Sequence, residues 1–407
     1  MENPKIRFKG FTKDWEQRKV SEITKFHKQG FYTTEEYDNS KKYYLLRGTD
    51  LTENKLVLKD TPKIDATEKD YDAFKTEIGD FLIVRSGTVG TYGIVDVDIP
   101  AIFGSYLIDF RFDMEQVTNE FFGYFYQSSL FKSQLNKIIQ ASANTNINAE
   151  NIKSTVISLP SLNEQRRISE YLGNLDNLIT LHQRKCEQTK KLKKYMLQKM
   201  FPQNGAKVPE IRFDGFTYDW EQRKLGDVAE FSKGNGYSKG DLIESGTPII
   251  LYGRLYTKYE TIISEVDTYV EAKEGSVYSK GGEVIVPASG ETAEDIARAA
   301  TVDKSGILLG GDLNVVMPNK DINPAFLAIS ISNGNSQREL SKKAQGKSVV
   351  HIHNEEIRNL VIPFPNKVEQ NKIVAYFANL DNLITLHQRK CDELKKMKKY
   401  MLQNMFI

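Results

Sequence analysis

Two long stretches of the chain carry apolar or small residues at alternating spacings of three and four. The first, residues 164–201, contains no proline and one glycine, Gly173, and is rich in residues that favour helices. The spacing predicts a helix with one buried face, and its extent over about five heptads is typical of a coiled coil. The expected seam positions are Ile168, Leu172, Leu175, Ile179, His182 and Cys186 in the first stretch, and Ile373, Phe377, Leu380, Ile384, His387 and Cys391 in the second.

The sequence leaves open which helix each of these stretches contacts. They could pair with each other within one chain, antiparallel, or they could pair between chains. Lys193 and Lys398 interrupt the two seams. In each seam a histidine and a cysteine lie four residues apart, but no further ligand residues lie nearby, so we expect buried seam residues and no metal site.

Outside the long stretches, apolar residues alternate over short runs. Residues 155–166 and 360–371 each read as a last strand that a proline ends before the helix begins. Short β-rich runs lie at 80–85, 106–113, 283–287 and 313–318, and the apolar segments 119–136 and 324–332 look helical. We therefore expect an α+β chain in which mixed α/β domains are joined by the two long helices.

The ends of one unit occur twice. Residues 4–20 return in closely similar form at 209–225, and residues 174–186 return unchanged at 379–391, in both cases about 205 positions later. The middles, roughly 27–135 and 232–340, differ widely. This pattern favours an arrangement in which the constant ends form a shared scaffold and the variable middles carry out different variants of the same function. The alternative is a duplicated domain whose middle has only drifted.

Composition narrows the class of protein. The chain has 407 residues, 40% of them hydrophobic and 27% charged, as an ordinary globular protein has. No apolar run approaches the ~20 residues that span a bilayer, and the start lacks the features of a secretory signal, so we expect a cytoplasmic protein. Two cysteines and five histidines are too few for a disulfide scaffold or a zinc site of four ligands. Because the net charge is only +2, any contact with DNA must come from local patches.

Loops in both middles carry groups that can contact bases and phosphates. Arginine pairs with guanine and asparagine with adenine, whereas hydroxyls and backbone amides bind phosphates. The candidate DNA-binding residues of the first half are Arg47, Thr49, Arg85, Ser86, Thr88, Ser105, Tyr106, Asn144, Thr145 and Asn146. Those of the second half are Lys233, Asn235, Tyr252, Arg254, Ser289, Lys347, Ser348 and His351. Of these, we expect Arg254 to stand on a loop and to face a guanine edge.

Motifs for catalysis are incomplete or missing. Gly346-Lys347-Ser348 resembles the end of a phosphate-binding loop, but Ser341 stands where that loop needs a glycine. Asn323-Pro324-Ala325-Phe326 lacks the second proline of the similar element in adenine methyltransferases. A nuclease reading of Asp267, Glu271 and Lys273 has no metal-binding hairpin to support it, so an acidic surface is the better interpretation. We expect no catalytic residue and no metal, and hence a chain that binds and positions while other chains catalyse.

The arrangement resembles the specificity subunit of type I restriction-modification systems, over essentially the whole chain. The motifs that carry the resemblance are ISLPSLNEQRRI at 157–168 and IPFPNKVEQNKI at 362–373, each of which opens a long stretch that contains NLDNLITLHQRK. The second copy departs from the usual pattern at Asn366-Lys367-Val368.

The resemblance implies two target-recognition domains, each reading one part of a bipartite asymmetric DNA sequence. In this interpretation residues 1–160 and 204–364 are the recognition domains, and 161–203 and 365–407 are spacer helices that form an antiparallel coiled coil with an internal pseudo-twofold repeat. It also implies two methyltransferase subunits and restriction subunits as partners on double-stranded DNA, with S-adenosylmethionine, ATP and Mg on those partners and no cofactor on this chain. The alternative is a coiled-coil adaptor without intrinsic affinity for DNA.

Overall fold

The computed structural model divides the chain into two compact units. Unit 1 comprises residues 1–183 and 388–407, and unit 2 comprises residues 184–387. The structure describes residues 3–34, 36–52, 54–85, 91–140, 147–203, 205–346 and 349–407. Within these ranges, no helix is long and apolar enough to cross a membrane.

Unit 1 is a mixed α/β structure built on a six-stranded sheet in the order β2-β10-β7-β8-β5-β4. A three-stranded sheet, β6-β3-β9, and the antiparallel pair β1-β11 complete it. Its strands are β1 (Glu16–Lys19), β2 (Thr24–Gln29), β3 (Tyr43–Leu46), β4 (Leu51–Thr52), β5 (Lys55–Leu56), β6 (Lys63–Ile64), β7 (Phe81–Val84), β8 (Tyr92–Ile94), β9 (Ala101–Phe103), β10 (Leu107–Phe112) and β11 (Val156–Leu159). Its short helices are α1 (Val20–Ile23), α2 (Glu68–Phe74), α3 (Asn119–Gln127), α4 (Ser129–Gln140) and α5 (Ala149–Lys153), so the helix expected over 119–136 is interrupted at Ser128.

Unit 2 repeats this plan with different details. Its sheets run β13-β23-β19-β21-β16 and β14-β17-β15-β22-β18, with the pairs β12-β25 and β20-β24. Its strands are β12 (Glu221–Lys224), β13 (Ala229–Lys233), β14 (Leu242–Ile243), β15 (Thr247–Ile250), β16 (Ile262–Ile263), β17 (Tyr269–Val270), β18 (Tyr278–Lys280), β19 (Glu283–Pro287), β20 (Ser289–Gly290), β21 (Ala300–Val302), β22 (Ser305–Leu309), β23 (Leu313–Pro318), β24 (Val350–His351) and β25 (Val361–Phe364). Its short helices are α7 (Arg254–Thr257), α8 (Ala293–Ile296), α9 (Pro324–Ile331), α10 (Gly334–Lys343) and α11 (Asn354–Arg358).

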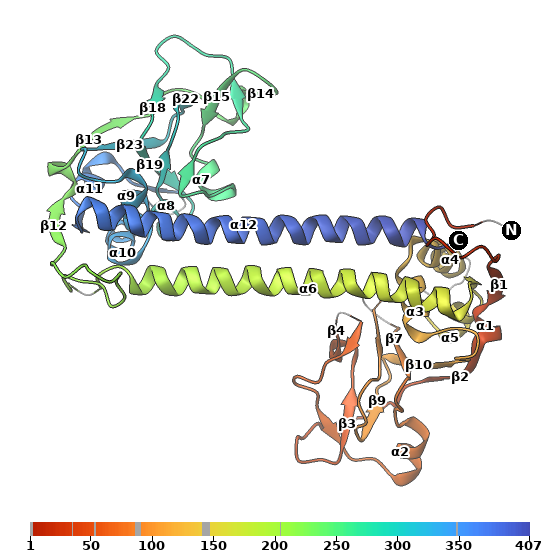
Figure 1. Cartoon of the computed structure of the whole chain (residues 1–407). Coiled ribbons are helices and arrows are strands. Elements are labelled where there is room, and N and C mark those ends of the chain that lie inside the picture. Colours follow the sequence, from red (N-terminus) through yellow and green to blue (C-terminus); the bar gives the residue numbers. More distant parts are fainter. Residues whose placement is uncertain are drawn as a thin grey trace. The chain divides into compact units, whose positions relative to one another are not determined.

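Two helices of 38 residues each follow the last strands: α6 (Leu162–Lys199) and α12 (Lys367–Asn404). A side chain just before each helix caps its first turn. The Ser161 hydroxyl accepts from the backbone amide of Glu164, and the side-chain oxygen Oδ1 of Asn366 accepts from the backbone amide of Glu369. Figure 1 shows both as single continuous ribbons.

Each unit has its own hydrophobic core, and the long helices take part in both. In unit 1, Ile168, Leu172 and Leu175 of α6 pack with Trp15 and with Phe406, which follows α12. Figure 1 shows this end of α12 beside α4. In unit 2, Ile373, Phe377 and Leu380 of α12 pack with Trp220 and with Phe201, which follows α6. The buried seam of each helix therefore begins as part of the core of a globular unit.

Candidate nucleic-acid interface

The same polar frame supports the globular part of both units. In unit 1 the Arg7 guanidinium donates to both oxygens of Glu164, at 2.7 and 2.9 Å. In unit 2 Arg212 donates to both oxygens of Glu369, at 2.7 and 2.8 Å. Both carboxylates are buried, and each raises the pKa of its arginine. Bidentate ion pairs of this kind fix the relative orientation of the two side chains in addition to pairing their charges.

A buried glutamine next to each of these carboxylates holds backbone atoms of the variable middle. Gln165 accepts from the amide of Thr118 at 2.9 Å and donates to the carbonyl of Gln116 at 2.8 Å. Gln370 makes the same contacts with the amide of Asn323 and the carbonyl of Asp321, at 2.7 and 3.2 Å. Because the groups that it contacts are backbone groups, this attachment does not depend on the side chains of the middle.

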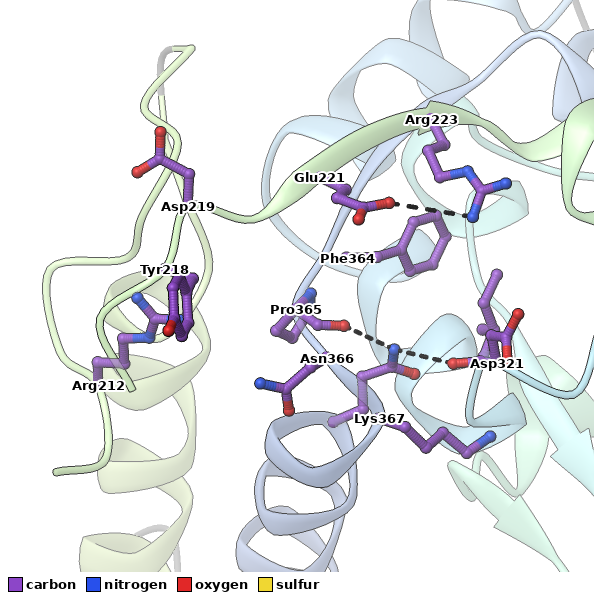
Figure 2. Close-up of a pocket in the computed structure, with 12 residues that line it drawn as sticks. Arg212, Tyr218, Asp219, Glu221, Arg223, Asp321, Phe364, Pro365, Asn366 and Lys367 are labelled. Carbon is purple, nitrogen blue, oxygen red and sulfur yellow. Dashed lines mark hydrogen bonds and ion pairs between the residues drawn. The ribbon is translucent and has the colours of Figure 1, made fainter. Parts of the chain in front are cut away.

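Beside the frame of unit 2 lies a hollow of about 410 Å³, shown in Figure 2. Charges of both signs line it, among them Arg223, Asp219 and Asp321. The Glu221 carboxylate lies 4.0 Å from Arg223, and Arg212 is already paired with Glu369. None of the candidate DNA-binding residues that the structure describes lies in this hollow, and its mixed charge gives it no preference for a polyanion.

A larger hollow, of about 820 Å³, lies in unit 1 between β3, β4 and the segment that follows β9. Four of the residues that the sequence suggested line it: Arg47, Thr49, Ser105 and Tyr106. Tyr32, Tyr37 and Thr91 are among the lining residues that the sequence did not suggest. Arg85 lies next to it, because its amide donates to the carbonyl of Tyr106 at 3.0 Å. The structure thus gathers residues as far apart in sequence as Tyr32 and Tyr106 at one place.

In unit 2, contacts link three of the suggested residues. The Ser289 hydroxyl and His351 Nδ1 share a hydrogen bond of 3.1 Å across the pair β20-β24. Tyr252 packs edge-to-face on Tyr256, whose hydroxyl donates to the Ser289 carbonyl. Ser289 itself is buried. Lys233 and Asn235 are exposed and lie at the end of β13, where Asn235 donates to the carbonyl of Gly275.

Seven of the suggested residues lie outside the part of the chain that the structure describes. These are Ser86, Thr88, Asn144, Thr145, Asn146, Lys347 and Ser348. Their assignment to DNA binding stays a prediction.

The expectation for Arg254 is wrong in its placement. The residue begins helix α7 rather than standing on a loop, and its side chain is only 7% exposed. Its guanidinium donates to Asp267 at 2.8 Å and to Glu260 at 2.7 Å. Lys258 and Arg254 together hold the pKa of Asp267 at about 2. A buried arginine with two carboxylate partners holds the segment that follows α7 and is not free to face a base.

Replacing Arg254 by alanine should therefore destabilise unit 2 and leave base discrimination intact. The change removes buried packing and two ion pairs, a loss of about 1–3 kcal/mol. Thermal and urea unfolding of the variant measure it, with Arg223→Ala as the matched control because Arg223 is exposed and weakly paired. Unaltered stability together with relaxed recognition of one base would restore the original interpretation.

A buried acidic pair in the sheet of unit 1 has a structural role. Arg111 lies between Asp80, at 2.7 Å, and Asp109, at 3.7 Å, and also pairs with Glu77. Burial, reinforced by the nearby charge of Asp80, raises the pKa of Asp109 to about 8. Among the described residues, no three histidine, cysteine, aspartate or glutamate side chains form a group that could hold a metal ion.

Most of the predicted seam residues are buried. Ile384, His182 and His387 are half-buried, and the remaining nine are buried. In unit 2 the Cys186 sulfur lies 3.9 Å from the carbonyl oxygen of Ile384. The two lysines that interrupt the seams make matching ion pairs with the opposite helix: Lys398 with Asp176 at 2.7 Å in unit 1, and Lys193 with Asp381 at 2.5 Å in unit 2.

Comparison with known proteins matches both halves of the chain. The model of the type I restriction modification DNA specificity domain fits residues 12–191 and again residues 218–396. The type I restriction enzyme MjaVIII specificity subunit of Methanocaldococcus jannaschii is 26% identical over 267 residues, which cover 62% of this chain and 61% of that protein. This chain thus spans less than two thirds of the length of that relative.

Solved structures show the same fold. The type I restriction-modification S subunit from M. genitalium aligns over 100% of this chain and 99% of its own, with a TM-score of 0.61 at 16% sequence identity. A chain from a structure of the type I R-M system aligns over 96% of this chain and 97% of its own, with a TM-score of 0.52 at 18% identity.

Proposed function

Because this chain belongs to the family of type I restriction modification DNA specificity domains, which it contains twice, we propose that its two halves each read one part of a bipartite, asymmetric DNA target. The chain itself catalyses nothing. Methyltransferase and restriction subunits bind to it, and S-adenosylmethionine, ATP and Mg belong to those partners.

The observation that carries this proposal is the identical frame beneath two unlike middles. The Arg–Glu pair and the backbone contacts of Gln165 and Gln370 are the same in both units, while the sheets and loops that they support differ. A frame that holds backbone atoms accepts different recognition surfaces without changing itself. Two surfaces of different chemistry on equal frames suit two different half-sites.

The ion pairs and packing between α6 and α12 support an antiparallel coiled coil as the spacer between the readers. In unit 1 Asp176 of α6 meets Lys398 of α12, and in unit 2 Lys193 of α6 meets Asp381 of α12. As residue numbers rise along one helix, those of the contacting residues fall along the other. Partly buried polar pairs in a seam favour one register over its alternatives.

An exposed apolar flank on the two helices supports two equal docking sites for methyltransferase subunits. Leu178 and Leu181 lie three residues apart and share one exposed face of α6, which is turned away from the buried seam position Ile179. Exposed apolar residues of both long helices form a set that we call the outer flank. It consists of Leu178, Leu181, Met397 and Tyr400 in unit 1, and of Leu383, Leu386, Leu192 and Tyr195 in unit 2. The two sets match residue for residue at the repeat offset, except that Leu192 takes the place of Met397. Two copies of one partner therefore meet nearly the same surface twice.

An exchange of one middle tests the proposal. Residues 27–140 are replaced by the corresponding segment of a relative, and methylated adenines are mapped across the genome of cells that carry the chain and its partners. The unaltered chain should yield a bipartite asymmetric motif, and the exchange should replace one half-site while the other half-site and the spacer stay the same. The unaltered pair of long helices is the internal control, since it is common to both chains. A change in both half-sites would contradict two independent readers.

A further inference from the structure

The hollow of unit 1 holds an arginine that is fixed in place and yet open to a ligand. We propose that Arg47 specifies a guanine in the half-site that unit 1 reads, and that Asp50 is its positioning residue. This inference rests on the proposed function, because it names the base that one of the two readers contacts.

The Arg47 side chain is held from one side only. Its Nε donates to Asp50 Oδ2 at 3.3 Å, and its Nη2 donates to Asp50 Oδ1 at 3.4 Å and to the carbonyl of Asp60 at 3.0 Å. None of these hydrogen bonds uses Nη1, and the side chain is 38% exposed where it lines the hollow. The two N–H groups of Nη1 remain, and they can donate to the adjacent acceptors O6 and N7 that guanine presents in the major groove.

Asp50 is itself fixed before any ligand arrives. Its carboxylate is 3% exposed and accepts from the Thr61 hydroxyl at 2.8 Å and from the Arg47 amide at 2.7 Å. A buried acceptor with these contacts cannot follow a moving arginine, so it sets the direction of the guanidinium. An arginine ordered in advance loses less entropy when it binds.

The pairing with Asp50 also favours a base over a phosphate. A guanidinium that shares its charge with a carboxylate attracts a phosphate weakly, because the pair is close to neutral. Its N–H donors remain, and a base edge offers acceptors without a full charge. The tyrosines around the hollow agree with this environment: Tyr32, Tyr37 and Tyr106 are 75%, 56% and 68% exposed. Exposed tyrosines supply rigid rings with a polar end, as recognition surfaces do.

Unit 2 differs at the corresponding place, so the inference concerns one half-site only. The bond from the Gly104 amide to the Leu46 carbonyl recurs as the bond from Gly310 to Ile250, both at 2.9 Å. Leu251 therefore stands where unit 1 has Arg47. The amide of Gly311 there donates to the Gly236 carbonyl at 2.6 Å, and the Tyr237 hydroxyl bonds to Ser276.

The test combines the wild-type motif with a binding matrix. Methylation mapping first identifies the half-site of unit 1, which must contain a guanine. The complex of the full chain with its methyltransferase subunits then competes for duplexes that carry each of the four bases at each guanine position. The wild-type complex should prefer guanine at one position by ~5- to ~150-fold, the range of one bidentate base contact. Arg47→Ala should reduce that preference to less than about twofold and leave every other position unchanged.

Two further variants separate base reading from charge and from folding. Arg47→Lys keeps the charge but loses the hydrogen bonds to Asp50 and Asp60 that fix the side chain, so it should lose most of the preference, and Asp50→Asn should weaken the preference at the same position. Lys59→Ala removes an exposed cation next to Asp60, whose carbonyl accepts from Arg47, and should keep the full preference. A uniform loss of affinity in Arg47→Ala with the preference retained, or a half-site without guanine, would overturn the inference. The absence of any bipartite motif in the wild type would instead contradict the proposed function.

Discussion

Four glutamates on the outer flank should abolish adenine methylation while the chain still folds and still binds DNA. The variant carries Leu178→Glu, Leu181→Glu, Leu383→Glu and Leu386→Glu, two changes in each unit. All four leucines are between 43% and 50% exposed, so the substitutions leave the buried cores of the chain untouched. Each leucine buried in an interface contributes about 1.5–3 kcal/mol to binding. Replacing two leucines by glutamates at each docking site should therefore weaken the binding of a methyltransferase subunit there by at least ~100-fold.

Size-exclusion chromatography with light scattering measures how many methyltransferase subunits remain bound, and sequencing measures methylation. The pair of changes at Leu178 and Leu181 alone should affect one docking site and leave one subunit bound. Ile78→Glu is the control, since it places a glutamate on an exposed apolar residue, 68% exposed, that is not part of the long helices. A fourfold variant that binds two subunits and methylates normally would show that the partner docks elsewhere.

Lengthening both long helices should change the gap between the half-sites and nothing else. Four residues inserted into each helix add ~6 Å and ~40° of turn. A base pair rises ~3.4 Å, and a turn of DNA takes ~10.5 base pairs. The preferred spacer should therefore grow by ~1 to 2 base pairs, while both half-site sequences persist.

The contact between Cys186 and Ile384 decides where the insertions go. Because these residues face each other in unit 2, insertions directly after each of them enlarge the two helices at the same level. Four extra residues shift the heptad phase, which the seam absorbs by local unwinding at some loss of stability. An insertion into α6 alone is the control, and it should disrupt the pairing. An unchanged spacer in an active complex with both insertions would mean that the helices do not set the distance.

The long helices and the repeat could be predicted from the sequence because both are local or periodic signals. The spacing of Ile168, Leu172 and Leu175 depends only on residues within a few turns. The frame could not be predicted in this way, since Arg7 and Glu164 lie 157 residues apart. The matching positions of Glu164 and Glu369 in the two copies were the available signal. It indicated a shared role but not a partner.

The recognition surfaces were harder to predict because burial decides the role of an arginine. Arg47 and Arg254 looked alike in the sequence, each beside a glycine in a loop-like segment. The structure buries Arg254 between Glu260 and Asp267, whereas it leaves Arg47 half-buried at the edge of a hollow. Asp267 is 63% exposed, as an acidic surface residue is, and it is also the ion-pair partner of Arg254. Sequence spacing alone does not show which carboxylate reaches which guanidinium.

The backbone contacts of Gln165 and Gln370 have a consequence for heredity. A frame that contacts main-chain atoms places few restrictions on the amino acids that follow one another between residues 27 and 140. Mutation and genetic exchange can therefore rewrite that segment without first altering the long helices or the outer flank. Under the proposed function, one such event changes the DNA sequence that a lineage marks as its own and leaves the proposed docking sites for the methyltransferase intact.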